Sequence, residues 1–215
     1  MDGLMENGIF WFQIAGTIAF AASAVLVVAP RGIDLFGAIT FGIITSVGGG
    51  TIRDIILGIP VFWSTDQYYI WLAAGTSLIT FYANGLFTRK YINKLVLYVD
   101  AIGVSLFAIQ ATHKVWLLDF ALPIGPMGLG IVTAIGGGLL RDMLAGRQTL
   151  LMTKELYAIP VMLGCVFFTL VLKYLPGLEL PGALICILFI AGLRIAAIEK
   201  NLTVPAWMTI AAKTN

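Results

Sequence analysis

A phrase of three glycines followed by an arginine and an aspartate occurs twice in this chain, as GGGTIRD at 48–54 and GGGLLRD at 136–142. Both copies are unfavourable in an apolar helix, because glycine costs roughly 1 kcal/mol relative to alanine and a buried charge also costs free energy. Three glycines let a helix kink and let an ion or another backbone come close. An Arg–Asp pair can meet a permeant ion or the charged ends of a zwitterion. The repeated phrase therefore indicates a binding or conduction site.

Helical spacing extends each phrase by hydroxyl-bearing residues one turn upstream. Residues four apart share a helix face, so each copy forms a polar stripe of hydroxyl, bare backbone and charge. The candidate pore residues are Thr45, Ser46, Gly48, Gly49, Gly50, Thr133, Gly136, Gly137 and Gly138, and the candidate charges are Arg53, Asp54, Arg141 and Asp142. Asp100 is a further charged candidate near the start of a later apolar segment, where it matches Gln13 of the first segment.

Structural roles compete with these functional ones. Small residues also fill the interfaces of membrane helices, so the glycines could serve close packing alone. The Arg–Asp pairs could be structural ion pairs at the membrane interface, and Asp100 could cap a helix there. An arginine at a pore mouth could also act as a tethered cation that repels or gates permeant ions.

The composition places these residues in a membrane. Of the 215 residues, 60% are hydrophobic and 11% are charged, and the mean hydropathy is +0.97, whereas soluble domains carry about 25% charged residues. The net charge of +2 is small and scattered, which excludes nucleic acid as an expected partner. Membrane lipids are the expected surroundings. The sequence predicts an all-α integral membrane protein.

Seven apolar segments are long enough to cross a bilayer, which takes about 20 residues of helix. They lie at 9–29, 35–57, 68–88, 95–113, 120–145, 155–175 and 182–199. The glycine triplets fall in the second and fifth segments. We therefore expect seven transmembrane helices, of which the second and fifth are kinked.

The spacing of the two phrases predicts an inverted repeat. Gly48 and Gly136 are 88 residues apart, and the match continues from TSVGGG at 45–50 and TAIGGG at 133–138 to Gly58 and Gly146. The repeated unit holds three spans, and an odd number of spans gives the second copy the opposite sense in the membrane. We expect one repeat at 1–90, a second at 91–176, and a seventh helix with a tail at 177–215.

The distribution of basic residues predicts the orientation, because cytoplasmic loops are enriched in Lys and Arg. With the N-terminus outside, ten Lys and Arg residues fall on the inner side and three on the outer side. No basic residue precedes Arg31, so the first segment lacks the basic start of a cleavable signal peptide. The sequence predicts a multi-pass protein of the cell (inner) membrane with a cytoplasmic C-terminus.

Enzymatic and metal sites are not expected. The chain has no GxSxG or HExxH motif, and its glycine-rich phrases lack the lysine of a phosphate-binding loop. His113 has no second His or Cys nearby in sequence, which argues against a metal site. No cofactor is expected other than permeant potassium or sodium ions.

With two GGGxxRD phrases, seven spans and a three-plus-three inverted plan, the sequence resembles the prokaryotic trimeric intracellular cation (TRIC) channels. Proteins of this kind are also known as glycine-transporter-like. The resemblance covers nearly the whole chain except the last fifteen or so residues. It implies a homotrimer in which each subunit has its own pore between the kinked second and fifth helices, conducting monovalent cations and above all potassium. The two Arg–Asp pairs would line or control that pore. The Lys-Glu-Val element of animal members is not found, since KEL at 154–156 does not match it.

Three functions remain open at this point. The first is a potassium-permeable channel in which hydroxyls and glycine carbonyls replace part of an ion's hydration. The second is a carrier for glycine or another small zwitterion, whose carboxylate would meet an arginine and whose ammonium would meet an aspartate. The third is a membrane scaffold in which the glycines only pack helices. The first two use the same residues.

Overall fold

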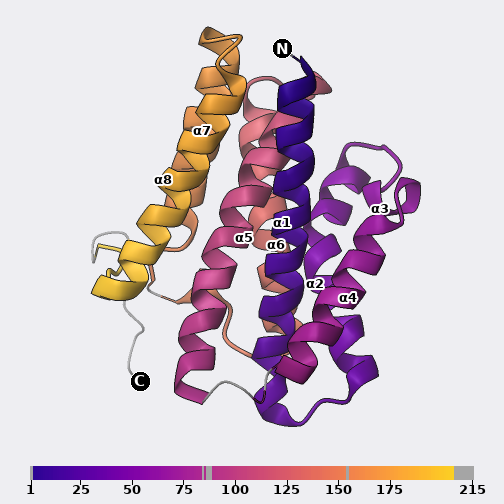
Figure 1. Ribbon diagram of the computed structural model, residues 1–215. Coiled ribbons are helices and arrows are strands. Elements are labelled where there is room, and N and C mark those ends of the chain that lie inside the picture. The colour runs from indigo at the N-terminus through magenta and orange to yellow at the C-terminus, as the bar shows by residue number, and fades with distance from the viewer. Residues whose placement is uncertain (1, 84, 86–88, 154, 206–215) are drawn as a thin grey trace, which may run out of the picture.

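Seven long helices cross the molecule in alternating directions (Figure 1). The computed structural model describes residues 2–83, 85, 89–153 and 155–205, and this part of the chain contains no strand. The long helices are α1 (Asp2–Val28), α2 (Leu35–Ile56), α4 (Tyr68–Ala83), α5 (Arg89–Leu117), α6 (Ile124–Leu144), α7 (Ala158–Tyr174) and α8 (Glu179–Lys200). Short helices lie in the connections, namely η1 (Ala29–Arg31), α3 (Phe62–Thr65) and η3 (Leu150–Met152).

Each long helix falls on one of the seven predicted spans, and the all-helical membrane fold is confirmed. Helices α1 and α5 begin several residues earlier than predicted, because hydropathy detects the apolar segment and not the polar turns that extend a helix beyond it. Within the described residues, five helices are long and apolar enough to cross a membrane. Helices α4 and α7 have 16 and 17 residues, slightly short of a hydrocarbon core about 30 Å thick.

The alternating directions give the two three-helix units opposite senses. Helix α2 runs upward in Figure 1, whereas α6, which carries the second glycine phrase, runs downward. Helix α8 runs downward in Figure 1, so its end lies lower in the view than the start of α1, which is at the top. The repeat boundaries at 90/91 and 176/177 stay predictions. The backbone is helical through both glycine triplets, and kinks at these positions also stay a prediction.

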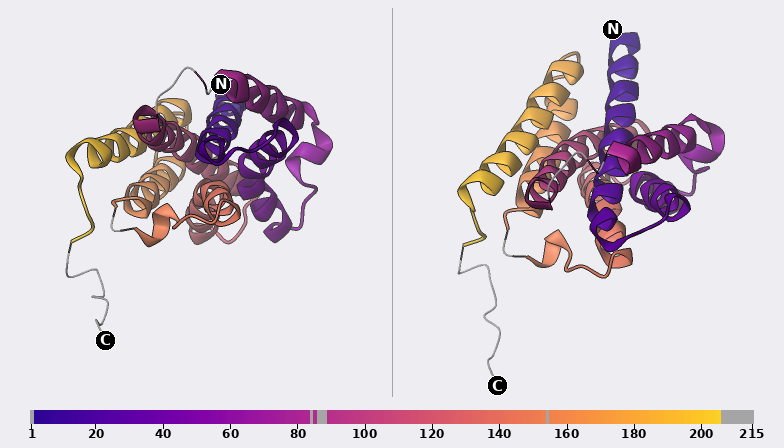
Figure 2. Two further views of the ribbon diagram at one scale, coloured as in Figure 1. Left: turned by 90° about the horizontal axis from the view of Figure 1, so that it is seen from below. Right: turned by 60° about the horizontal axis from the view of Figure 1, so that its bottom comes forward.

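Helices α1 and α5 form the centre of the bundle. Helices α2 and α4 pack on one side of them and α7 and α8 on the other, as the views in Figure 2 also show. Phe20 of α1 and Phe107 of α5 pack together with ring centroids 5.1 Å apart. The outward faces carry exposed apolar side chains such as Phe36 (80% exposed) and Ile124 (74% exposed). Such a surface is suited to lipid or to a neighbouring subunit.

The lower end of the molecule gathers most of the basic residues that the sequence assigns to the cytoplasmic side. Arg31, Lys94, Arg147 and Lys200 lie at or near helix ends on this side, and Lys114 and Lys173 lie near the other end. Arg31 also donates a hydrogen bond to the carbonyl of Ala145 at the end of α6. Lys154 and Lys213 lie outside the described residues. Which end faces the cytoplasm stays a prediction.

Candidate functional site

Helices α2 and α6 touch through their backbones at the central glycine of each triplet. A Cβ atom at Gly49 would overlap the carbonyl oxygen of Thr133, and a Cβ atom at Gly137 would overlap the carbonyl oxygen of Thr45. The contact is reciprocal, since each glycine faces the carbonyl of the residue that lies one helical turn before the other glycine. Only glycine permits this approach. The backbones of the two helices are thus in direct contact at this level.

The four flanking glycines also make room for neighbours. A Cβ at Gly48 would overlap Leu140, and one at Gly50 would overlap the ring of Phe62. Gly136 lies against the backbone of Gly49, and Gly138 lies against Tyr157 Oη and Asp100 Oδ1. The close-packing role is therefore present at all six positions, whatever further role they have.

Two of the three predicted pore hydroxyls are bonded within their own helix. Ser46 Oγ donates to the carbonyl of Gly42 at 2.7 Å, and Thr133 Oγ1 donates to the carbonyl of Leu129 at 2.6 Å. The Oγ1 of Thr45 is buried and has no hydrogen-bond partner among the described residues. Thr45 thus offers a hydroxyl that local helix bonding has not taken up.

A first group of polar side chains, called here the α2 cluster, surrounds the end of α2. Arg53 Nε donates to Asp54 Oδ1 at 2.8 Å, and Arg53 Nη1 donates to Gln110 Oε1 at 3.0 Å. Lys114 Nζ lies 2.9 Å from the same Asp54 oxygen. Gln110 Nε2 in turn donates to Gln13 Oε1 at 3.3 Å. Two cations therefore share one carboxylate, and the formal charge of the cluster is +1.

A second group, the α6 cluster, surrounds the end of α6. Arg141 Nε donates to Asp142 Oδ1 at 2.9 Å, and Arg141 Nη1 reaches Asp100 Oδ1 at 2.8 Å and Ser23 Oγ at 3.0 Å. The guanidinium of Arg194, from α8, lies near the other Asp100 oxygen, with Nη2 and Oδ2 3.9 Å apart. Two cations meet two carboxylates, so the formal charge is zero.

The two clusters repeat the same connections at opposite ends of the molecule. Each arginine bonds the aspartate that follows it, and each reaches α1 and α5, Arg53 by way of Gln110 to Gln13 and Arg141 directly to Ser23 and Asp100. Gln13 and Asp100 are 87 residues apart, as are Ser23 and Gln110. The pseudo-symmetry thus extends from the backbone to the polar partners. The arginines and aspartates are at most 4% exposed.

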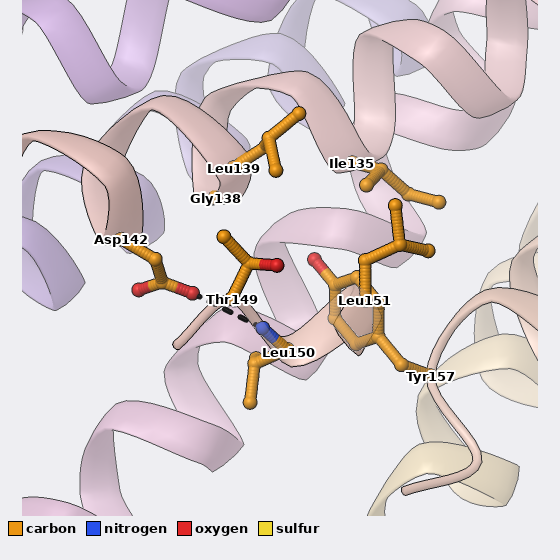
Figure 3. A pocket seen from close by; sticks show the side chains of 8 residues that line it. All are labelled: Ile135, Gly138, Leu139, Asp142, Thr149, Leu150, Leu151 and Tyr157. Atoms are coloured by element: carbon orange, nitrogen blue, oxygen red, sulfur yellow. Dashed lines mark hydrogen bonds between the residues drawn. The ribbon is translucent and has the colours of Figure 1, made fainter. Parts of the chain in front are cut away.

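Each aspartate also fixes the chain that leaves its helix. Asp54 Oδ2 accepts the backbone N–H of Phe62 at 2.9 Å, and Asp142 Oδ2 accepts that of Leu150 at 3.4 Å (Figure 3). Two residues beyond the end of each helix lies a glycine with positive φ, 67° at Gly58 and 58° at Gly146, which is the conformation that favours glycine just after a helix C-terminus. The repeated GGGxxRD phrase therefore also encodes a helix end and its loop.

Two hollows adjoin the α6 cluster. The narrow crevice of Figure 3, about 150 Å³ in all, lies between Asp142, Tyr157 and neighbouring loop residues and is too narrow to admit water. A larger cavity of about 310 Å³ lies between α5, the end of α6 and the loop that follows. Its polar lining includes Arg141, Asp142, Arg147 and Glu155.

The sequence identified five of the charged residues in the two clusters and missed others. Arg53 and Asp54 lie in the α2 cluster, and Asp100, Arg141 and Asp142 lie in the α6 cluster. The missed members are Ser23, Gln110, Lys114 and Arg194. A signal for Ser23 and Gln110 was present, because both are polar residues within apolar spans at equivalent positions of the two repeats. Arg194 lies in a helix outside the repeats, so the symmetry gives no signal for it.

Comparison with known proteins relates the chain to membrane transport proteins. A family model described as "Glycine transporter" matches residues 10–84 and 97–173. The UPF0126 inner membrane protein YadS of Escherichia coli (strain K12) is 32% identical over 204 residues, which cover 93% of this chain and 96% of that protein.

Solved structures agree with this relationship. A TRIC trimeric intracellular cation channel orthologue from Rhodobacter sphaeroides superposes with a TM-score of 0.84 at 29% identity, covering 90% of this chain and 98% of that one. A prokaryotic TRIC channel crystallised in 0.5 M KCl superposes with a TM-score of 0.83 at 31% identity, covering 91% and 98%. These matches are to channels and membrane proteins, which indicates that the chain is not an enzyme. The chain therefore belongs to the glycine-transporter family of membrane proteins and shares the fold of the prokaryotic trimeric intracellular cation channels, as the doubled GGGxxRD phrase predicts.

Proposed function

We propose that this protein is a channel for monovalent cations, permeable to potassium, with a conduction path inside each subunit along α2 and α6. One observation carries the proposal: two pseudo-symmetric charged clusters lie at opposite ends of one glycine-lined helix crossing, in a fold shared along nearly its whole length with solved cation channels. Buried ionisable residues in membrane helices usually pair with one another or face a water-filled path. Here the ionisable residues pair with one another, and the cavity beside Arg141 and Asp142 is where a water-filled path would begin.

The geometry of the crossing corresponds to a closed channel. The backbones of α2 and α6 meet at Gly49 and Gly137, so conduction requires these helices to separate or slide past each other. A permeant cation would also have to pass Arg53 and Arg141. Asp54, Asp100 and Asp142 offset part of the positive charge that would otherwise repel it. In this proposal the hydroxyl of Thr45 and the glycine carbonyls provide oxygen ligands once the helices part.

The matched prokaryotic structure is described as trimeric, and we propose a homotrimer for this chain, with its exposed apolar faces shared between lipid and neighbouring subunits. The basic residues at the lower end favour a cytoplasmic position for the end of α8.

A carrier for glycine or another small zwitterion is the second candidate. It is favoured by the description of the family and by the lining of the larger cavity, where Arg141 and Arg147 accompany Asp142 and Glu155. Such a lining has groups of the right charge for both a carboxylate and an ammonium.

Recording from the purified protein in planar bilayers separates the two candidates. Under a potassium gradient, with and without glycine, a channel gives discrete current steps that reverse near the potassium equilibrium potential. Arg53→Ala and Arg141→Ala should alter those steps, whereas Lys173→Gln, which removes an exposed charge that belongs to neither cluster, should not. Absence of steps, together with accumulation of labelled glycine in liposomes that contain the same protein, would reject the channel and support the carrier.

A further inference from the structure

Arg194 is a buried cation that the two repeats do not explain. It belongs to α8, the helix outside the three-plus-three plan, and its side chain is 0% exposed. The second cation of the α2 cluster comes instead from α5, as Lys114. The α6 cluster therefore depends on α8 for its neutrality, whereas the α2 cluster does not.

The position of Arg194 is held by the start of α7. Arg194 Nη1 donates to the carbonyl of Leu156 at 3.2 Å, and the guanidinium carbon lies 4.5 Å from the ring centroid of Tyr157. A cation over an aromatic face is stabilised by the ring's electrons. The carboxylate of Asp100 is not what fixes this side chain.

The contact between Arg194 and Asp100 is electrostatic and not hydrogen-bonded. Nη2 and Oδ2 are 3.9 Å apart, and within the described part of the chain neither atom has a hydrogen-bond partner, nor does Arg194 Nε. Arg141, in contrast, bonds the other Asp100 oxygen at 2.8 Å. A structural ion pair would be expected to close this gap, as Arg141 does. The open geometry indicates that Arg194 acts on Asp100 through its charge and not through a hydrogen bond.

We infer that Arg194 sets the conductance of this end of the pathway by cancelling the charge of Asp100. With Arg194 the α6 cluster is formally neutral, and without it the cluster would carry a charge of −1 beside the cavity that Arg141 and Asp142 line. A negative charge at a low-dielectric cavity concentrates cations there. Arg194 therefore limits cation entry from the α6 end. This inference rests on the proposed channel function.

The test is single-channel recording of charge-changing variants in potassium chloride. Arg194→Gln should raise the unit conductance for cations entering from the α6 end by roughly two- to threefold near 0.1 M salt, less than the roughly tenfold or greater focusing by clefts lined with many charges, because a single charge changes. The effect should largely disappear near 1 M, where the screening length falls from about 10 Å to about 3 Å. Arg194→Lys should conduct like the unmodified protein. Lys200→Gln, which removes an exposed charge from the same helix, is the matched control and should change little.

A second comparison keeps the test decisive if Arg194→Gln does not assemble. Asp100→Asn should lower the conductance, because the cluster becomes positive, and adding Arg194→Gln should restore it. A double variant that stays at the level of Asp100→Asn would overturn the inference. So would Arg194 variants that lose stability but keep the unit conductance and its salt dependence.

The outcomes also separate this inference from the channel proposal. If the unmodified protein gives no unitary current, the channel function fails, and the role of Arg194 fails with it. If the unmodified protein conducts and the Arg194 and Asp100 variants conduct identically, only the role of Arg194 fails.

Discussion

At the scale of single residues, Asp54 and Asp142 make the same bonds in different electrostatic surroundings. Each binds the arginine before it and a backbone N–H eight residues later. Asp54 is the only carboxylate that the described contacts give to Arg53 and Lys114, whereas Arg141 has Asp100 as well. The equivalent aspartates of the two repeats therefore differ in how many cations rely on them for a counter-charge.

This difference predicts unequal effects of the same substitution. Asp54→Asn leaves two buried or half-buried cations without a counter-charge and should cost about 3–5 kcal/mol of stability, as removal of one partner of a buried ion pair does. Asp142→Asn leaves Arg141 paired with Asp100 and should cost about 1.5–3 kcal/mol, the range for a hydrogen bond to a charged group. Thermal or denaturant unfolding in detergent micelles measures both. Equal losses would show that the two clusters do not differ in the way their contacts suggest.

Most cluster residues that the sequence predicts belong to a local pattern, whereas Arg194, which it does not predict, joins them through tertiary packing. Arg53, Asp54, Arg141 and Asp142 belong to a local repeated phrase, so their association could be read directly from the chain. Arg194 joins them only because α8 packs against α5 and α7, a tertiary relationship that no local pattern specifies.

At the scale of elements, the crossing of α2 and α6 determines how close the two repeats can come. The sequence predicts both helices and the small residues within them. It leaves open whether the glycines pack or conduct, because close packing and exposed carbonyls both require the absence of a side chain. The structure shows the packing directly, through the reciprocal contacts of Gly49 and Gly137.

Alanine substitution at the crossing should therefore separate the helices. Gly49→Ala and Gly137→Ala place a methyl group against a carbonyl of the facing helix and should each cost about 1–3 kcal/mol, the usual range for overpacking. Gly128→Ala is the matched control in α6, because a methyl group there would meet no neighbouring atom of the described residues within 4 Å. It should be neutral or stabilising by up to about 1 kcal/mol. Unfolding midpoints in detergent test the order, and a Gly128→Ala loss as large as that at Gly49 would contradict it.

At the scale of the whole molecule, the alternating helices place the loops after α2 and α6 at opposite ends (Figure 1). The sequence predicts this arrangement from an odd number of spans per repeat. It also predicts which end is cytoplasmic from the distribution of basic residues.

Cysteine labelling in cells tests the orientation. Thr65→Cys, after α2, should react with a membrane-impermeant maleimide in intact cells. Met152→Cys, after α6, should react only once the inner membrane is permeabilised. Both positions are exposed, and the natural residues Cys165 and Cys186 are buried, which keeps the background low. The opposite pattern of labelling would reverse the assigned orientation.

The correspondence between Ser23 and Gln110, and between Gln13 and Asp100, has a consequence for how such a molecule can diversify. Two identical polypeptides associated as an antiparallel pair would have to use one residue for both tasks at each of these positions. Within a single fused chain the two copies mutate independently, so a serine can do on one side what a glutamine does on the other. The independence of the two copies is thus what allows the two ends of the molecule to differ in charge, and a pair of identical halves could not acquire that polarity.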